Sequence, residues 1–79
     1  MRARVYITLK PDVHDPAGQA VRKGLVDLGY DEVRDVRIGR FVELDLDASP
    51  AGDARARVAD MCARLLANGV VEDVRVELE

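Results

Sequence analysis

The fold of this chain is decided by residues 29–47, GYDEVRDVRIGRFVELDLD. From Val36 onward the even positions are apolar except for Arg40, and the odd positions are polar or small except for Phe41. This alternation predicts a strand with one buried face and one face in water. About fourteen residues would span about 45 Å, whereas a compact chain of this size has a radius of gyration of about 12 Å. We therefore expect one long strand, bent at Gly39, whose far half curls over the core or pairs with another subunit.

A hairpin in the middle of this stretch is the alternative to one long strand. A tight turn at Gly39 would place Val36 opposite Glu43 on the same face of the sheet. That pairing breaks the apolar face, so the sequence favours the long bent strand.

The residues before this stretch predict one strand and one helix. Residues 3–9 alternate apolar and polar side chains, the pattern of a half-buried strand. Asp15 followed by Pro16 supplies an N-cap with proline at the first helical position, and Gly29 supplies the residue that ends a helix. A helix is therefore expected over residues 16–28.

Two glycines lie inside this predicted helix, Gly18 and Gly24. Each costs about 1 kcal/mol relative to Ala in a helix. We therefore expect the helix backbone to pack closely against the sheet or against a partner chain at one or both positions.

The residues after the long strand predict a second helix and a last strand. Ser49 followed by Pro50 repeats the cap-then-proline pattern, and apolar side chains at helical spacing continue to a stop at Asn68. Cys62 lies on this apolar stripe, where an unpaired thiol behaves as a small buried hydrophobe. Val70 and Val71 then begin a last strand, in which apolar side chains at 74, 76 and 78 alternate with charged ones at 75, 77 and 79.

Together these elements predict an α+β fold in the order β-α-β-α-β. Its two layers are a mainly antiparallel sheet with a long bent central strand, and two helices packed on one face of that sheet. If the long strand counts as two, the order approaches the ferredoxin-like β-α-β-β-α-β arrangement. With 79 residues, the chain is expected to form one domain, residues 1–79, near the lower limit for a self-sufficient core.

Association with other chains is the expected source of further stability. A single Cys rules out an internal disulfide, and no cluster of Cys and His offers a structural metal. Small chains without such cross-links are often stabilised by oligomerisation. A homodimer or a homotetramer is therefore expected, and the sequence leaves these two open.

The charge and hydropathy of the chain argue against two classes of partner. A net charge of -3, with 34% of residues charged, provides no basic stripe for nucleic acid. The first apolar run is short and alternating, so no signal peptide or membrane span is expected. With the unpaired Cys, these features predict a cytoplasmic protein that binds neither nucleic acid nor membrane.

No residue pattern predicts catalysis by this chain. His14 is the only histidine, and it lies in a predicted loop with no Cys or second His near it in sequence. Glycine-rich phosphate loops are absent, and the paired carboxylates are typical of solvated turns and strand faces. We therefore expect no catalytic, cofactor-binding or metal-ligating residues.

Arg37 and Arg40 flank Gly39 and suggest an interaction surface. Arg40 interrupts the buried face of the strand, where an apolar residue is the default. Its guanidinium can bind carboxylate, phosphate or backbone carbonyls, so a contact with a partner and a side chain extending off the end of the sheet both fit. An alternative function follows, a stand-alone dimeric regulatory module in which both arginines hold the carboxylate of a small ligand such as an amino acid.

Four motifs spread along the chain carry a family resemblance: VYITLK at 5–10, GY at 29–30, VRIGR at 36–40 and LLAN at 65–68. With these motifs the chain resembles the PurS family, the small subunit of phosphoribosylformylglycinamidine synthase. Two positions differ from the usual pattern of that family. Arg40 stands where Lys is usual, and Gly69 stands where Pro commonly follows Asn68.

The resemblance implies a non-catalytic subunit in purine biosynthesis. In that family's reaction, formylglycinamide ribonucleotide becomes the amidine with glutamine and ATP. A glutaminase subunit releases ammonia, a large synthetase subunit binds ATP, and the small subunit bridges them and assists ammonia transfer. ATP and Mg are therefore expected on the large partner, with no cofactor on this chain. The expected partner contacts are His14, Asp15, Gly18, Arg37, Gly39 and Arg40.

Overall fold

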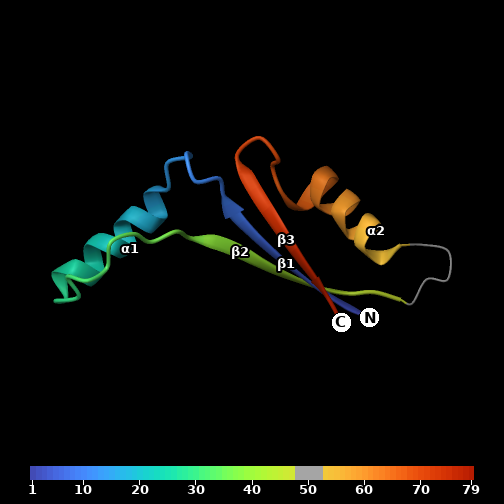
Figure 1. Cartoon of the computed structure of the whole chain (residues 1–79), viewed down its shortest axis with the longest axis horizontal. Helices are drawn as coiled ribbons and strands as arrows, with labels where there is room; N and C mark the ends of the chain where they lie inside the picture. The colour runs from blue at the N-terminus through green and yellow to red at the C-terminus, as the bar shows by residue number, and fades with distance from the viewer. Residues whose placement is uncertain (48–52) are drawn as a thin grey trace.

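The computed structural model describes residues 1–47 and 53–79. Over these residues the order strand, helix, strand, helix, strand confirms the predicted α+β class (Figure 1). The elements are β1 (Arg2–Leu9), α1 (Pro16–Asp27), β2 (Gly39–Asp45), α2 (Ala54–Met61), the π-helical turn η1 (Cys62–Leu66) and β3 (Glu72–Leu78).

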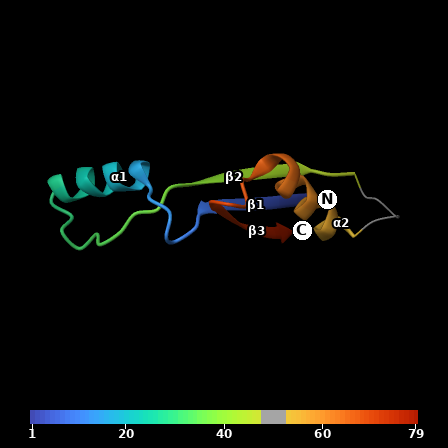
Figure 2. The same cartoon turned by 90° about the horizontal axis from the view of Figure 1, so that it is seen from above.

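Strand β1 is the centre of a three-stranded sheet in the described part of the chain. The strand order is β2-β1-β3, and both pairs are antiparallel, as predicted. Val5 lies between Val42 of β2 and Val76 of β3. Because side chains alternate along a strand, these three share one face, and α2 lies over that face (Figures 1 and 2).

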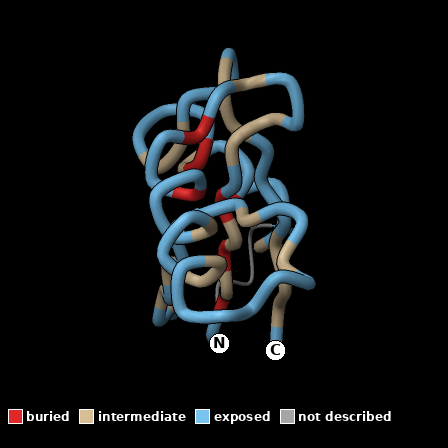
Figure 3. The backbone as a smooth tube through the Cα atoms, turned by 90° about the vertical axis from the view of Figure 1, so that its left-hand side faces the viewer, coloured by how far each residue is buried: buried red, intermediate tan, exposed pale blue. Residues whose placement is uncertain are grey.

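A narrow hydrophobic core lies between β1 and the second helical segment. Buried residues make up only short stretches of the described backbone (red in Figure 3). Within the described residues the core consists of Ala3, Val5, Ile7, Val58 and Cys62, each at most 4% exposed. Cys62 is therefore the small buried hydrophobe that the sequence predicts. Burial raises the pKa of its thiol, because the thiolate loses solvation.

Helix α1 departs from the predicted two-layer packing, because it lies beyond the end of the sheet and not on its face (Figure 1). Val21 of α1 and Leu28, the residue that caps its C-terminal end, are 43% and 76% exposed. The physical reason is that α2 already occupies this small sheet, while α1 packs against the extended residues that precede β2. Arg22 Nε of α1 donates to the carbonyl of Arg34 there at 3.0 Å.

We call α1 together with residues 28–38 the arm. Because the arm projects from the sheet, the chain measures 53 × 24 × 15 Å and has a radius of gyration of 16.1 Å. A compact chain of this length would have a radius of gyration of about 12 Å. The arm, a large part of this small protein, therefore lies outside the hydrophobic core.

The strand that forms from the alternating stretch, β2, is also shorter than the alternation predicts. Strand β2 begins at Gly39, so Val36 and Ile38 are extended but unpaired, and Gly39 starts the strand instead of bending its middle. The reason lies in β1, whose pairing with β2 ends at Thr8 opposite Gly39. Only Leu9 of β1 lies beyond that point, so β1 is too short to pair with the arm.

Several predicted element ends are confirmed. Asp15 caps α1, Pro16 is its first residue, and Gly29 follows it with a φ of 105°. The predicted cap at Ser49 and Pro50 lies outside the described residues. Helix α2 is instead capped by Asp53, whose carboxylate accepts the N–H of Arg55 at 3.0 Å.

Candidate functional site

The joint between the arm and the sheet, residues 10–18 and 36–40, brings together several of the predicted contact residues. Asp15 is at its centre and is only 4% exposed. Its Oδ1 accepts the N–H of Gly18 at 2.9 Å, and its Oδ2 accepts the N–H of Ile38 at 2.8 Å. One carboxylate thus caps α1 and ties its first turn to the chain that enters β2.

These hydrogen bonds hold the pKa of Asp15 below its ordinary value. The bond from Gly18 contributes most and the bond from Ile38 next, and the positive charge of Arg37 also favours the carboxylate, against the effect of burial. Asp15 is therefore an ionised anchor at neutral pH, and both of its oxygens have donors in the chain.

Arg37 fixes the loop on the other side of the joint. Its Nη2 donates to the carbonyl of Lys10 at 2.9 Å and to the carbonyl of Val13 at 3.0 Å. His14 follows directly in this loop and is exposed. The guanidinium therefore holds the β1–α1 loop in place, a role that the sequence did not predict.

Both glycines of the joint allow a close approach of backbone. A Cβ on Gly18 would lie 2.2 Å from the carbonyl oxygen of Val36, and a Cβ on Gly39 would lie 2.4 Å from that of Ile7. Gly18 therefore packs closely, as predicted, but against the segment that precedes β2 and not against the sheet or a partner chain. At Gly24 a Cβ would meet nothing within 4 Å.

Arg40 is on the same face as the core but at the end of the sheet, opposite Ile7. Its Nη2 donates to both carboxylate oxygens of Glu72 at 2.9 Å, and the two side chains are 55% and 16% exposed. The backbone N–H of Asn68, first, and Arg40, second, lower the pKa of Glu72. Arg40 therefore joins β2 to the start of β3, and the sequence missed Glu72 as its partner.

The predicted residues thus gather at one end of the sheet, where β1 ends and where β2 and β3 begin. Asp15, Gly18 and Arg37 form one connected group, Gly39 and Arg40 begin β2, and His14 lies in the exposed loop. Their contact with partner chains stays a prediction. Both arginines of the regulatory-module alternative already have acceptors within the chain.

Two further structural tests concern metals and membranes. Across residues 1–47 and 53–79, no three His, Cys, Asp or Glu side chains are grouped so that they could hold a metal ion. Over the same residues, neither helix has the length and apolar character needed to cross a bilayer.

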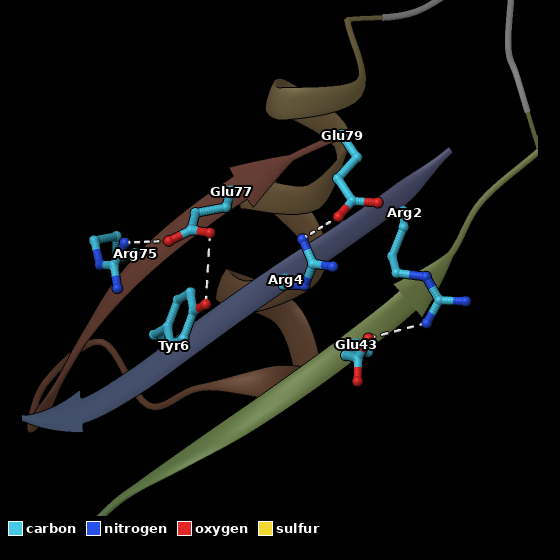
Figure 4. Close-up of polar contacts among 7 residues, drawn as sticks. All are labelled: Arg2, Arg4, Tyr6, Glu43, Arg75, Glu77 and Glu79. Carbon is cyan, nitrogen blue, oxygen red and sulfur yellow. Dashed lines mark hydrogen bonds and ion pairs between the residues drawn. The ribbon is translucent and has the colours of Figure 1, made fainter.

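The face of the sheet opposite α2 carries an aromatic and charged surface that sequence analysis did not single out (Figure 4). The rings of Tyr6 and Phe41 lie 5.1 Å apart, and the guanidinium of Arg75 lies 4.2 Å from the centre of the Tyr6 ring. Period-2 alternation alone could have placed these side chains on one face. The ion pairs on this face are Arg2–Glu43, Arg4–Glu79 and Arg75–Glu77.

Comparison with known proteins identifies the family. The family model described as "PurS: Phosphoribosylformylglycinamidine (FGAM) synthase" matches residues 2–79. The chain belongs to the PurS family. It is 49% identical over 75 residues to the phosphoribosylformylglycinamidine synthase subunit PurS of Synechocystis, covering 95% of this chain and 75% of that protein. It is 46% identical over 78 residues to the Bacillus subtilis subunit, covering 99% of this chain and 92% of that one.

Solved PurS structures have the same fold as this chain. The B. subtilis PurS structure superposes with a TM-score of 0.90 at 46% identity, covering 99% of this chain and 96% of that one. A chain in the structure of PurLQS from Thermotoga maritima superposes with a TM-score of 0.85 at 26% identity, covering 96% and 93%. These matches confirm the predicted family and fold class, and they place the chain among the subunits of FGAM synthase, an enzyme of purine biosynthesis.

Proposed function

We propose that this chain is the non-catalytic subunit that bridges the glutaminase and synthetase subunits of FGAM synthase and helps ammonia pass between them. The observation that carries this proposal is the projecting arm, which leaves Val21 of α1 and the adjoining Leu28 exposed. A helix of this length is marginal in water by itself, and exposed apolar side chains of this kind are typical of surfaces that bind other chains.

A second copy of the chain is the proposed first partner of the arm. Met1 and Leu46 exchange backbone hydrogen bonds, so the alternation of the ladder points the backbone of Phe41 and Glu43 toward the free edge of β2. Residues 33–38 of a second copy would pair there as a fourth strand. That strand would complete the ferredoxin-like order that the sequence approaches.

The same docking would give α1 a surface to cover. Val42 and Leu44 of β2 are only partly buried and lie on the face of the sheet that α2 leaves incomplete. The apolar side chains of a second copy's α1 match this surface in character, and the homo-oligomer would bury both. The proposed minimal unit is therefore a homodimer, and pairing of two dimers would give the homotetramer.

The chemistry belongs to the proposed partners. The large synthetase subunit would bind ATP and Mg and act on formylglycinamide ribonucleotide, while the glutaminase subunit would release ammonia from glutamine. Free ammonia is mostly protonated at neutral pH and ammonium is not a nucleophile, so a protected passage raises the yield. A small chain that holds two active sites in register serves this purpose without catalytic groups, in the cytoplasm where purine synthesis would take place.

The test is the synthesis of the amidine by the glutaminase and synthetase subunits, with and without this chain, using either glutamine or added ammonia. We expect the chain to be required with glutamine and dispensable with ammonia. If it changed neither rate, the bridging role would be wrong. Saturable binding of an amino acid or nucleotide by the isolated chain would then favour the regulatory module.

Arg40 tests the proposed contact surface within that assay. Arg40→Ala removes an exposed guanidinium and should leave the fold intact, while glutamine-dependent synthesis falls. Arg57→Ala, which removes an exposed arginine of α2 away from the joint, is the matched control. Unchanged activity of the Arg40 variant in the reconstituted complex would remove Arg40 from the contact surface.

A further inference from the structure

The outer edge of β3, on the side of the sheet away from β2, pairs with no other strand among residues 1–47 and 53–79. Lys10 N–H donates to Val71 O at 2.8 Å and Glu79 N–H to Arg2 O at 3.0 Å, which fixes the phase of the β1–β3 ladder. The odd residues of β3 therefore bond to β1. The backbone N–H and C=O groups of Val74, Val76 and Leu78 point away from the sheet.

An apolar groove of about 290 Å³ runs beside this edge. Ala59, Cys62 and Ala63 form the wall on the helical segment, and Val74 and Val76 form the wall on β3. The small side chains of the helical wall leave room for larger side chains from another chain. Gly69 lies at one end of the groove. The next residue, Val70, has an apolar side chain that is 81% exposed.

Arg55 provides a positive charge at this edge. Its Nη1 donates to the outward carbonyl of Val76 at 3.2 Å, so its guanidinium lies over the edge from the first turn of α2. Covering one carbonyl in this way protects an edge from indiscriminate pairing. The guanidinium could release the carbonyl to an incoming N–H and bind a carboxylate instead, which would make the edge selective.

This groove is separate from the surface proposed for the second copy. Ala59 and Ala63, four residues apart, lie on the flank of the helical segment that lines the groove, whereas Met61 and Leu65 lie half a turn away on the opposite flank. Leu65 is 85% exposed. The second copy's arm would approach from the β2 side, so the β3 edge and its groove would stay open in the homodimer.

We propose that the β3 edge takes up an extended segment of a partner subunit as an additional strand. The segment is defined by its chemistry: a free backbone for pairing with Val74 and Val76, apolar side chains at alternate positions for the groove, and an acidic group for Arg55. This mode of recognition combines main-chain hydrogen bonds with pockets for alternate side chains. The inference rests on the proposed function, because it takes the strand from the synthetase or glutaminase subunit.

Amide hydrogen exchange tests the proposal at single residues. Amide protons of the ¹⁵N-labelled chain are allowed to exchange in two samples, the isolated chain and the chain assembled with both partner subunits. After quenching, NMR measures how much of each amide proton is retained. We expect the amides of Val74 and Val76 to exchange at least about tenfold more slowly in the complex, while the Arg75 amide, already bonded to β1, changes little. The amides of Phe41 and Glu43 should exchange slowly even in the isolated chain, because the second copy in the homodimer would pair with them.

Three outcomes would overturn the proposal, and they differ in what else they affect. If size-exclusion chromatography shows assembly but Val74 and Val76 exchange as before, the proposed function stands and the strand addition is wrong. If those amides are already slow in the isolated chain, the occupant is a second copy and not a partner subunit. If no assembly occurs, the proposed function fails as well.

A pair of variants separates the groove from general effects on the helix. Ala63→Gln places a longer polar side chain in the groove at an exposed position, and we expect about tenfold weaker assembly, the effect of losing one well-packed interface residue. Asp60→Gln places the same side chain on the solvent side of the same helix, where the side chain is 66% exposed. Equal assembly by the two variants would contradict docking in the groove.

Discussion

Replacing Gly18 by Ala should destabilise the chain, although Ala is the better helix former. A Cβ at this position would lie 2.2 Å from the carbonyl oxygen of Val36, and contacts below 3.0 Å are essentially never tolerated, so the gap must open by about 0.8 Å. That oxygen belongs to backbone held nearby by the bond from Ile38 N–H to Asp15. Overpacking costs up to about 3 kcal/mol, against a gain of about 1 kcal/mol in helix propensity. The expected net loss is about 2 kcal/mol.

Gly24→Ala is the matched control, since its Cβ would meet nothing within 4 Å. It should stabilise the chain by about 1 kcal/mol. For a domain of this size these changes correspond to a fall in Tm of about 10 °C for the first variant and a rise of about 5 °C for the second. Thermal unfolding followed by circular dichroism, repeated at several protein concentrations because association shifts Tm, measures both. An equal rise in both variants would refute the contact between α1 and the segment before β2.

Three further predictions concern the core, the helix cap and the thiol. Val58→Ala truncates a side chain with 0% exposure and should cost about 2 kcal/mol in urea denaturation, whereas Val70→Ala, at 81% exposed, should cost less than about 0.5 kcal/mol. Backbone hydrogen bonds lower the pKa of Asp15 in the folded chain from its ordinary value of 3.8. Because the unfolded chain therefore binds the proton more tightly, the ionised carboxylate stabilises the fold fully above pH 3.8, and this stabilisation is lost as the pH falls below that value. Asp15→Asn should therefore flatten the loss of stability on acidification, and an unchanged pH profile would contradict this role. Burial raises the pKa of Cys62, so iodoacetamide should alkylate it more slowly in the folded than in the urea-unfolded chain, and equal rates would mean that the thiol is accessible.

Local sequence patterns predicted the elements well because their causes are local. Asp15 and Pro16 start α1 through a side-chain cap and a fixed φ, and Gly29 ends it with a positive φ. The alternation in residues 3–9 became the central strand, with Ala3, Val5 and Ile7 buried. Each of these signals acts within a few residues, and no tertiary contact is needed to interpret it.

The placement of α1 could not be predicted in the same way. Its apolar positions indicate that one side must be covered, but periodicity does not say whether the cover comes from the same chain. The alternation at Val36 and Ile38 carries the same ambiguity, because a pattern typical of a paired strand persists where this chain supplies no neighbour. The sequence allows the far half of the strand to pair with another subunit, which stays a prediction, but it predicts α1 on the face of the sheet.

The candidate site was predicted as a set of residues and not as a set of contacts. Arg40 drew attention because it breaks an apolar face, yet its acceptor, Glu72, is 32 residues away. Glu72 is one of the paired carboxylates that sequence analysis assigned to solvated turns and strand faces. The register of two antiparallel pairs places Ile7 opposite Arg40 and Leu9 opposite Glu72. Since β1 lies between them, only the strand order β2-β1-β3 could have revealed the pair.

Folding and assembly are expected to be coupled in this chain, and the joint is where the coupling acts. The arm contributes little to the core in one copy, so its burial must come from another chain if it is to add stability. Asp15 nevertheless joins α1 to the segment that precedes β2, and Arg37 joins that segment to the loop after β1, through hydrogen bonds with defined geometry. A preset arm loses less conformational freedom on docking than a loose one. The proposed task of this subunit is to hold two larger subunits at a fixed separation. A rigid arm would allow so small a chain to do this.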